Sequence, residues 1–486
     1  MKKLQQLFLL SLVLLSFGGF LNAQVIGDPG WVFDGSGTVT GFWNKQQRWA
    51  DAGVEGGIRN PDRNVTIQIR RWMNNSRIQT ELNNLSSAGG GVANFQSGTY
   101  TITQTINVPK NVVLQGTGSS TIIKDALSTN NSGTDGKVIE FNGLTGSNGH
   151  VVGGIRRMRF EGPFGGTPNH YNWSDTRSNA NNIMINILRS ENIFLDQVTI
   201  INSGGSPVST FRGGHHTIRR CTIDGVWNKG SGGHGYFSIQ SGDCLIYDNF
   251  IQHLRHFTIQ KSFAQYNVVF KNTINQDINF HNDDGGNNLI EDNDIRINSS
   301  LASAGGATRY TVMGPWADVH TDSRTDNYVY HNTVLGQNKR CQNNSRLYKG
   351  ARGKEPNKDP GNNPFSTYET VGSNKRFYSV RNGSARSRVA SAQGTAEESV
   401  TEQEIAQEFG LNIYPNPVKV GETLHLTLPD DMLNGDVRVV DMNGKILLEK
   451  FNITEKNLDL TLQAKGLNHI QFIKGERTLK FKLFVE

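Results

Sequence analysis

Short apolar runs recur along the middle of the chain, each followed after a polar pair by one closing apolar residue. The closing residues are Ile200, Ile223, Ile251, Ile274, Ile295 and Val334. Successive steps are 21 to 28 residues, except for the last, which is 39. A repeat in the low twenties suits one coil of a stacked β-structure, in which each coil buries its apolar side chains only against its neighbours.

An asparagine stands two residues before four of these closing positions. The four are Asn249, Asn272, Asn293 and Asn332. Amide side chains that occupy the same turn of successive coils donate and accept along the stack. We therefore predict that these asparagines form a structural ladder and not a functional site.

The segment ahead of the repeat contains further short strands separated by glycine and asparagine turns. It opens with GGGVANFQSGTY at Gly89 to Tyr100 and continues through Val112-Val113-Leu114-Gln115-Gly116. This segment resembles the opening of pectate-lyase-like right-handed parallel β-helices, the fold of secreted polysaccharide lyases. The resemblance implies an all-β chain with a β-helix over residues 88–383. Residues 24–87 are expected to cap its N-terminal end, with an amphipathic helix over roughly 65–85.

The two ends of the chain carry export signals. Lys2 and Lys3 precede a short apolar run, and Ala23 offers a cleavage point, which is the pattern of a signal peptide over residues 1–23. Residues 384–410 are rich in serine, alanine and glutamate and read as a linker.

The last segment, residues 411–486, contains YPNP at 414–417 and DMNGK at 441–445. These landmarks resemble the C-terminal sorting domain of type IX secretion substrates, a small β-sandwich. The resemblance implies handling by the type IX machinery and a secreted or cell-surface location.

The net charge of the chain indicates the class of binding partner only in part. The whole chain has a net charge of +6, and the first 385 residues carry +9 because residues 386–486 carry −3. Such an excess suits an anionic partner, although ordinary solubility charge explains it equally well. The chain lacks the motifs of nucleic-acid readers, so no nucleic acid is expected. The spacing of the three cysteines fits neither a disulfide framework nor a metal-binding motif. We expect the protein to be a monomer.

Period-2 alternation places polar side chains on the outer side of three consecutive coils. Aligning YFSIQ at 236–240, HFTIQ at 256–260 and DINFH at 277–281 gives three outward columns. The first column holds Tyr236, His256 and Asp277. The second holds Ser238, Thr258 and Asn279, and the third holds Gln240, Gln260 and His281.

These columns supply the candidate site. The predicted catalytic residues are His256, Arg255, Lys261, Tyr236 and His281. The predicted substrate-binding residues are His234, Gln260, Asp277, Asn279 and Arg219. Asp283 and Asp284 lie in a glycine-rich segment and are either calcium ligands or ordinary turn residues, so Ca²⁺ is the one cofactor considered.

The residue types favour a polysaccharide lyase. β-Elimination at a uronic acid needs a base, an acid and groups that offset the substrate carboxylate, and the columns offer all three. The substrate would be an anionic polysaccharide such as ulvan, alginate or a pectin-like chain. A glycoside hydrolase, which needs two carboxylic residues, and a non-catalytic glycan-binding β-helix stay as alternatives.

Overall fold

The protein is described from a computed structural model. The structure describes residues 25–29, 31–33, 42–58, 65–128, 136–146, 151–165, 180–229, 234–297, 312–313, 320–336, 347–350, 377–378, 380–382, 412–414, 418–428, 433–441, 446–463, 465–474 and 477–485. The predicted signal peptide and linker lie outside these residues. The chain divides into two compact units, one of residues 1–117 and 121–395 and one of residues 396–486 with the short stretch 118–120.

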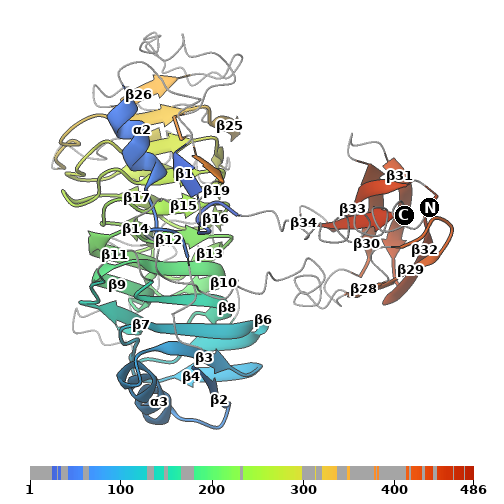
Figure 1. Ribbon diagram of the computed structural model, residues 1–486, viewed down its shortest axis with the longest axis horizontal. Helices are drawn as coiled ribbons and strands as arrows, with labels where there is room; N and C mark the ends of the chain where they lie inside the picture. Colours follow the sequence, from blue (N-terminus) through green and yellow to red (C-terminus); the bar gives the residue numbers. More distant parts are fainter. Residues whose placement is uncertain are drawn as a thin grey trace, which may run out of the picture. The chain divides into compact units, whose positions relative to one another are not determined.

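The first unit is a stack of coils built from three series of parallel strands (Figure 1). The first series is β2 (Thr66–Ile69), β3 (Gly91–Phe95), β6 (Val112–Asp125), β8 (Gly153–Glu161), β10 (Ile193–Ser203), β12 (Thr217–Arg219), β15 (Leu245–Tyr247), β18 (Val268–Phe270), β21 (Leu289–Glu291), β24 (Asn327–Tyr330) and β26 (Leu347–Gly350). The second is β4 (Gly98–Ile102), the C-terminal halves of β6, β8 and β10, and then β13 (Thr222–Val226), β16 (Phe250–Gln252), β19 (Thr273–Asn275), β22 (Asp294–Ile297) and β25 (Thr333–Gly336).

The third series forms a separate eight-stranded sheet and carries the candidate site. Its strands are β5 (Ile106–Asn107), β7 (Lys137–Asn142), β9 (Ile183–Glu191), β11 (Ser206–Gly214), β14 (Tyr236–Ile239), β17 (His256–Ile259), β20 (Ile278–Phe280) and β23 (Val312–Met313). This architecture confirms the prediction of an all-β chain built on a parallel β-helix.

Alternation along each strand fills the interior of the coils. Phe237, Phe257 and Phe280 are fully buried in one continuous apolar core, and the Phe237 and Phe257 rings stack at 4.9 Å. A coil alone cannot bury these side chains, so stacking on neighbours provides the stabilisation.

Two asparagine ladders hold the corners of the coils. In the predicted ladder, the Asn272 side chain donates to Asn293 Oδ1 and accepts from Asn249 Nδ2, both at 2.9 Å. A second ladder, which the sequence reasoning missed, runs through Asn267, Asn288 and Asn327, again with amide contacts of 2.9 Å. Each side chain satisfies backbone or amide groups that would otherwise be buried without a partner.

The residues before the repeat do not all lie at the N-terminal end. Helix α3 (Asn75–Ser87) lies beside β2 and β4 at that end, with Ile78, Leu82 and Leu85 buried (Figure 1). It is shorter than the predicted helix because residues 66–69 pair with β3 as a strand.

Helix α2 (Trp43–Ala50), in contrast, packs against late coils. Trp49 contacts the rings of Tyr328 and Phe377, and its Nε1 donates to the Asn287 carbonyl at 2.7 Å. Nearby, β1 (Trp31–Phe33) pairs antiparallel with β27 (Val380–Asn382). The early residues therefore cover apolar outer side chains of the β-helix, a role that local patterning does not reveal.

The second unit has a hydrophobic core drawn from residues 418–485. A three-stranded antiparallel sheet has the order β28-β29-β32 and a four-stranded one the order β31-β30-β33-β34. Their bounds are β28 (Asn412–Tyr414), β29 (Thr423–Thr427), β30 (Gly435–Asp441), β31 (Ile446–Ile453), β32 (Asn457–Thr461), β33 (Gly466–Lys474) and β34 (Arg477–Val485). The predicted small β-sandwich is confirmed. None of the helices within the described ranges is long and apolar enough for a membrane span.

Candidate active site

The outer face of the third sheet carries the predicted polar columns in the predicted register. Tyr236 lies opposite His256, and Ser238 lies opposite Thr258. Thr258 in turn lies opposite Asn279 on the next coil. The alternate side chains of the same strands belong to the core, so the columns point away from it.

A histidine–aspartate pair is the centre of this face. His256 Nδ1 lies 2.6 Å from Asp277 Oδ2, and both side chains are buried, at 1% and 0% exposed. The other carboxylate oxygen of Asp277 accepts from Gln276 Nε2 at 3.0 Å. A carboxylate at Nδ1 fixes the imidazole with its proton on that nitrogen, which makes Nε2 the acceptor. The pair can therefore take a proton at Nε2 and stabilise the resulting imidazolium.

Two rings, Tyr236 and His281, lie near His256, and His320 lies beside His281. The Tyr236 ring centroid lies 5.4 Å from that of His256 and 5.5 Å from that of His281. The His256 and His281 centroids are 6.0 Å apart, and His320 lies 4.4 Å from His281. We call Tyr236, His256, His281 and His320 the ring cluster.

His320 was missed by the sequence reasoning, although a signal was present. The last step of the apolar repeat is 39 residues, and His320 lies 39 residues after His281. The same offset joins Asn282 to Thr321 through a backbone-to-amide bond of 2.9 Å. Applying the repeat step to the histidine column would have placed His320 in the site.

Burial shifts the pKa values of two members of the ring cluster, Tyr236 and His281. It raises the pKa of Tyr236, an effect that Arg255 opposes and Asp277 reinforces. It also lowers the pKa of His281 to about 3, helped by His256, His320 and the cations Arg255 and Lys261. Tyr236 is therefore a protonated phenol that can donate, and His281 is a neutral imidazole that is too weak a base to accept a proton readily.

Cationic and amide groups complete the site. The Arg255 guanidinium lies 5.3 Å from the Tyr236 ring centroid. Gln260 Nε2 donates to Ser238 Oγ at 3.3 Å. Asn279 is fully buried, and its Oδ1 has no hydrogen-bond partner among the described residues. Unpaired buried polar atoms are rare in native proteins and are often matched by a ligand or water.

The remaining predicted residues differ in their placement. Lys261 is half-buried and is close enough to lower the pKa of His281. His234 is half-buried and precedes β14 by two residues.

Arg219 is not part of the cluster. It lies on β12 in the first series, fully buried, and pairs with Asp28 at 2.6 Å and Asp196 at 3.0 Å. Burial would raise the pKa of Asp196, but Arg219 and Arg220 outweigh it and hold that pKa below its usual value. These contacts give Arg219 a structural role.

The Asp283 and Asp284 oxygens are occupied by protein donors. Both oxygens of Asp283 accept from Arg324, at 2.8 and 3.0 Å. Asp284 accepts from Ser323, Asn327 and the Gly286 backbone, and burial raises its pKa to about 6. Within the described part of the chain, no group of three His, Cys, Asp or Glu side chains could hold a metal ion. The geometry favours turn residues over calcium ligands.

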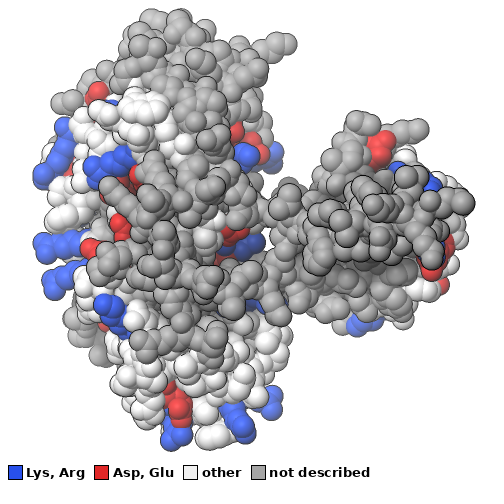
Figure 2. Space-filling view, viewed as in Figure 1, with Lys and Arg blue, Asp and Glu red and all other residues white. Residues whose placement is uncertain are grey.

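The distribution of surface charge does not identify the binding partner. Figure 2 shows basic and acidic side chains interspersed over the described surface of the β-helix on the face in view. A single basic field, of the kind that steers a polyanion, is not seen on that part of the surface.

Comparison with solved structures finds only distant similarities. The chain is 14% identical to PorZ of the type IX secretion system of Porphyromonas gingivalis, covering 17% of this chain and 12% of PorZ, with a TM-score of 0.15. It is 13% identical to the A-module of mannuronan C-5 epimerase AlgE6 from Azotobacter vinelandii, covering 57% and 89%, with a TM-score of 0.31. It is 14% identical to an iota-carrageenase from A. fortis, covering 60% of each chain, with a TM-score of 0.30. TM-scores this low say nothing about the activity or substrate of this chain. No curated protein matches the sequence.

The C-terminal unit matches a known protein family. Residues 412–486 match the family of the secretion system C-terminal sorting domain. The match agrees with the YPNP and DMNGK landmarks and with the observed sandwich. Residues 412–486 are therefore a type IX sorting domain, and the protein is exported to the cell surface or secreted.

Proposed function

We propose that the protein is a secreted polysaccharide lyase that cleaves a uronic-acid-containing chain by β-elimination at the ring cluster. The observation that carries the proposal is the buried contact of 2.6 Å between His256 and Asp277 on an outward face. A histidine held by a buried carboxylate is a base poised to accept a proton, and mere glycan binding has no need of one.

The proposed reaction assigns one proton transfer to each end of the broken bond. His256 Nε2 takes the proton from C5 of the uronic acid, and Asp277 stabilises the imidazolium that forms. The C5 electron pair becomes a C4–C5 double bond while the C4–O bond breaks. Tyr236, kept protonated by its raised pKa, gives its proton to the leaving oxygen.

Other groups bind the substrate carboxylate. Arg255 and Lys261 are half-buried and offset its charge. Gln260 and Asn279 supply amide donors, and the unpaired Asn279 Oδ1 accepts from a sugar hydroxyl. Neutral His281 packs against Tyr236 and fixes its ring.

A hydrolase has less support. Inverting and retaining hydrolases both need two available carboxyl groups. Asp277 is engaged by His256, and the oxygens of Asp283 are held by Arg324. Asp284 is fully buried among amide and hydroxyl donors. Each of these three carboxylates thus has another role.

The test is cleavage of alginate, ulvan and pectin-like chains, followed by ultraviolet absorbance of the unsaturated product. His256→Ala is expected to lower turnover by about 100-fold or more, the usual scale for a lost acid–base group. His253→Ala is the matched control, because His253 makes a similar 2.6 Å contact with Asp224 outside the cluster. Equal turnover in both variants would place the chemistry elsewhere.

A further inference from the structure

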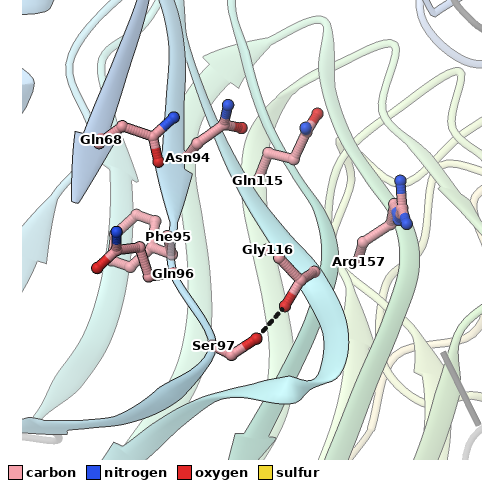
Figure 3. A pocket seen from close by; sticks show the side chains of 9 residues that line it. Gln68, Asn94, Phe95, Gln96, Ser97, Gln115, Gly116 and Arg157 are labelled. Atoms are coloured by element: carbon pink, nitrogen blue, oxygen red, sulfur yellow. Dashed lines mark hydrogen bonds between the residues drawn. The ribbon is translucent and has the colours of Figure 1, made fainter. Parts of the chain in front are cut away.

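A hollow lined mostly by polar residues lies on the first coils, away from the ring cluster. It has a volume of about 590 Å³ and is lined by side chains of β2, β3, β6 and β8. Figure 3 shows Gln68, Asn94 and Gln115 side by side, with Arg157 beyond them. These strands belong to the first and second series, whereas the ring cluster lies on the third sheet, several coils later.

The three amides form an outward column with one member per coil. Gln68 lies opposite Asn94, and Asn94 lies opposite Gln115 in the parallel register. Neighbouring strands are about 4.8 Å apart, so the column offers a donor and an acceptor at that interval. Unlike the asparagine ladders, it faces a hollow, and the Gln68 side chain is exposed. A ligand rich in hydroxyl groups matches such a column.

Two buried polar atoms of the residues that line this hollow have no hydrogen-bond partner in the described part of the chain. Asn94 Oδ1 is an unpaired acceptor, and Arg157 Nε is an unpaired donor. The neighbouring Gln115 Oε1, in contrast, accepts from Arg156. An unpaired buried atom calls for a ligand or water, and here one atom needs a donor and the other an acceptor. A sugar hydroxyl satisfies the first, and a carboxylate or sulfate satisfies the second.

The wall of the hollow is built to a fixed shape. Gly116 passes close to Arg157, since a Cβ added there would lie 2.3 Å from the Arg157 carbonyl oxygen. The Ser97 and Thr117 hydroxyls lie 2.9 Å apart (Figure 3). The Thr117 hydroxyl also lies 3.0 Å from that of Thr121. These contacts tie the loop before β4 to the middle of β6. The hollow is therefore largely formed before a ligand enters.

We propose that this hollow is a second saccharide-binding site that takes an acidic sugar unit. Hydroxyl groups bind the column of Gln68, Asn94 and Gln115, and the carboxylate or sulfate binds Arg157. The choice of an acidic saccharide rests on the proposed function. The site would anchor the polymer at the first coils while another stretch of it reaches the ring cluster.

The test measures binding by the full chain in a His256→Ala background, so that cleavage cannot consume the probe. The probes are an alginate oligosaccharide, a sulfated oligosaccharide and a neutral cello-oligosaccharide, titrated by calorimetry. Arg157→Gln is expected to weaken binding of the preferred acidic probe about tenfold, and Gln68→Ala by a smaller factor. Lys110→Gln removes an exposed cation outside the hollow and is the matched control. Gln68 is exposed, so its substitution leaves folding intact.

The outcomes separate the two proposals. If Arg157→Gln and Gln68→Ala bind the probes as tightly as the Lys110→Gln control while the wild type cleaves polymer, the proposal of a second site is wrong and the lyase proposal stands. If the wild type cleaves none of the acidic polymers but Arg157→Gln still loses binding, the lyase proposal is wrong and the site stands. Equal affinity for the neutral and acidic probes would overturn the assignment of an acidic ligand.

Discussion

Substituting Asp277 by asparagine removes the charge that supports His256 while keeping the shape of the side chain. Both partners are buried and their contact is 2.6 Å. With charge centres about 4 Å apart and an effective dielectric constant near 20, the lost attraction to an imidazolium is about 4 kcal/mol. Because each 1.36 kcal/mol is a factor of ten in rate, turnover of a substrate that needs His256 as base should fall by up to about 1,000-fold. The amide also donates where the carboxylate accepted, which favours the wrong imidazole tautomer.

The assay is initial-rate cleavage followed by product absorbance, alongside thermal unfolding. Asp224→Asn is the matched control, because it breaks the 2.6 Å contact between Asp224 and His253 on the second series of strands. We expect the control to keep wild-type turnover and the Asp277 variant to stay folded. A folded Asp277→Asn protein with turnover within about threefold of wild type would refute the role of the pair.

Three further predictions concern stability and modularity. Asn272→Ala removes bonds to the Asn249 backbone and side chain and to the Ile246 carbonyl, so the free energy of unfolding should fall by about 3–9 kcal/mol, at about 1–3 kcal/mol for each of the three groups left unpaired. Urea unfolding that matches wild type would contradict the ladder's role. Burial lowers the pKa of His216 to about 3, so folding opposes its protonation and stability drops as pH falls below the unfolded value of about 6.5; between pH 7 and pH 5 this site should cost about 2 kcal/mol, which His216→Gln removes. A chain ending at Ser384 should keep the wild-type thermal midpoint and activity, because the core of the C-terminal unit contains only residues 418–485; insolubility of that chain would show that the first unit needs the second.

The coil architecture was predictable because each coil repeats the same local pattern. The apolar closing positions and the asparagines before them fix the register of successive coils, and the ladder through Asn249, Asn272 and Asn293 follows. The columns of Tyr236 and His256 follow from the same register and period-2 alternation.

What the sequence could not reveal depends on contacts between distant segments. Trp49 packs on Tyr328 although their separation bears no relation to the repeat. Arg219 was predicted to bind substrate, but it is buried and pairs with Asp28 from the early segment. Burial of an outward column likewise depends on what covers it, so the raised pKa of Tyr236 could not be predicted from the sequence.

The most direct test of the central claim is the mass of the product released from a uronic-acid polymer in heavy-oxygen water. Elimination adds no water to the products. We therefore expect an unsaturated fragment that carries no solvent label at the cleaved bond and has one water less in mass than the fragment from hydrolysis. His256→Ala should abolish that fragment, whereas His253→Ala should not. A saturated fragment that carries one labelled oxygen from the solvent would contradict the account and make the protein a hydrolase.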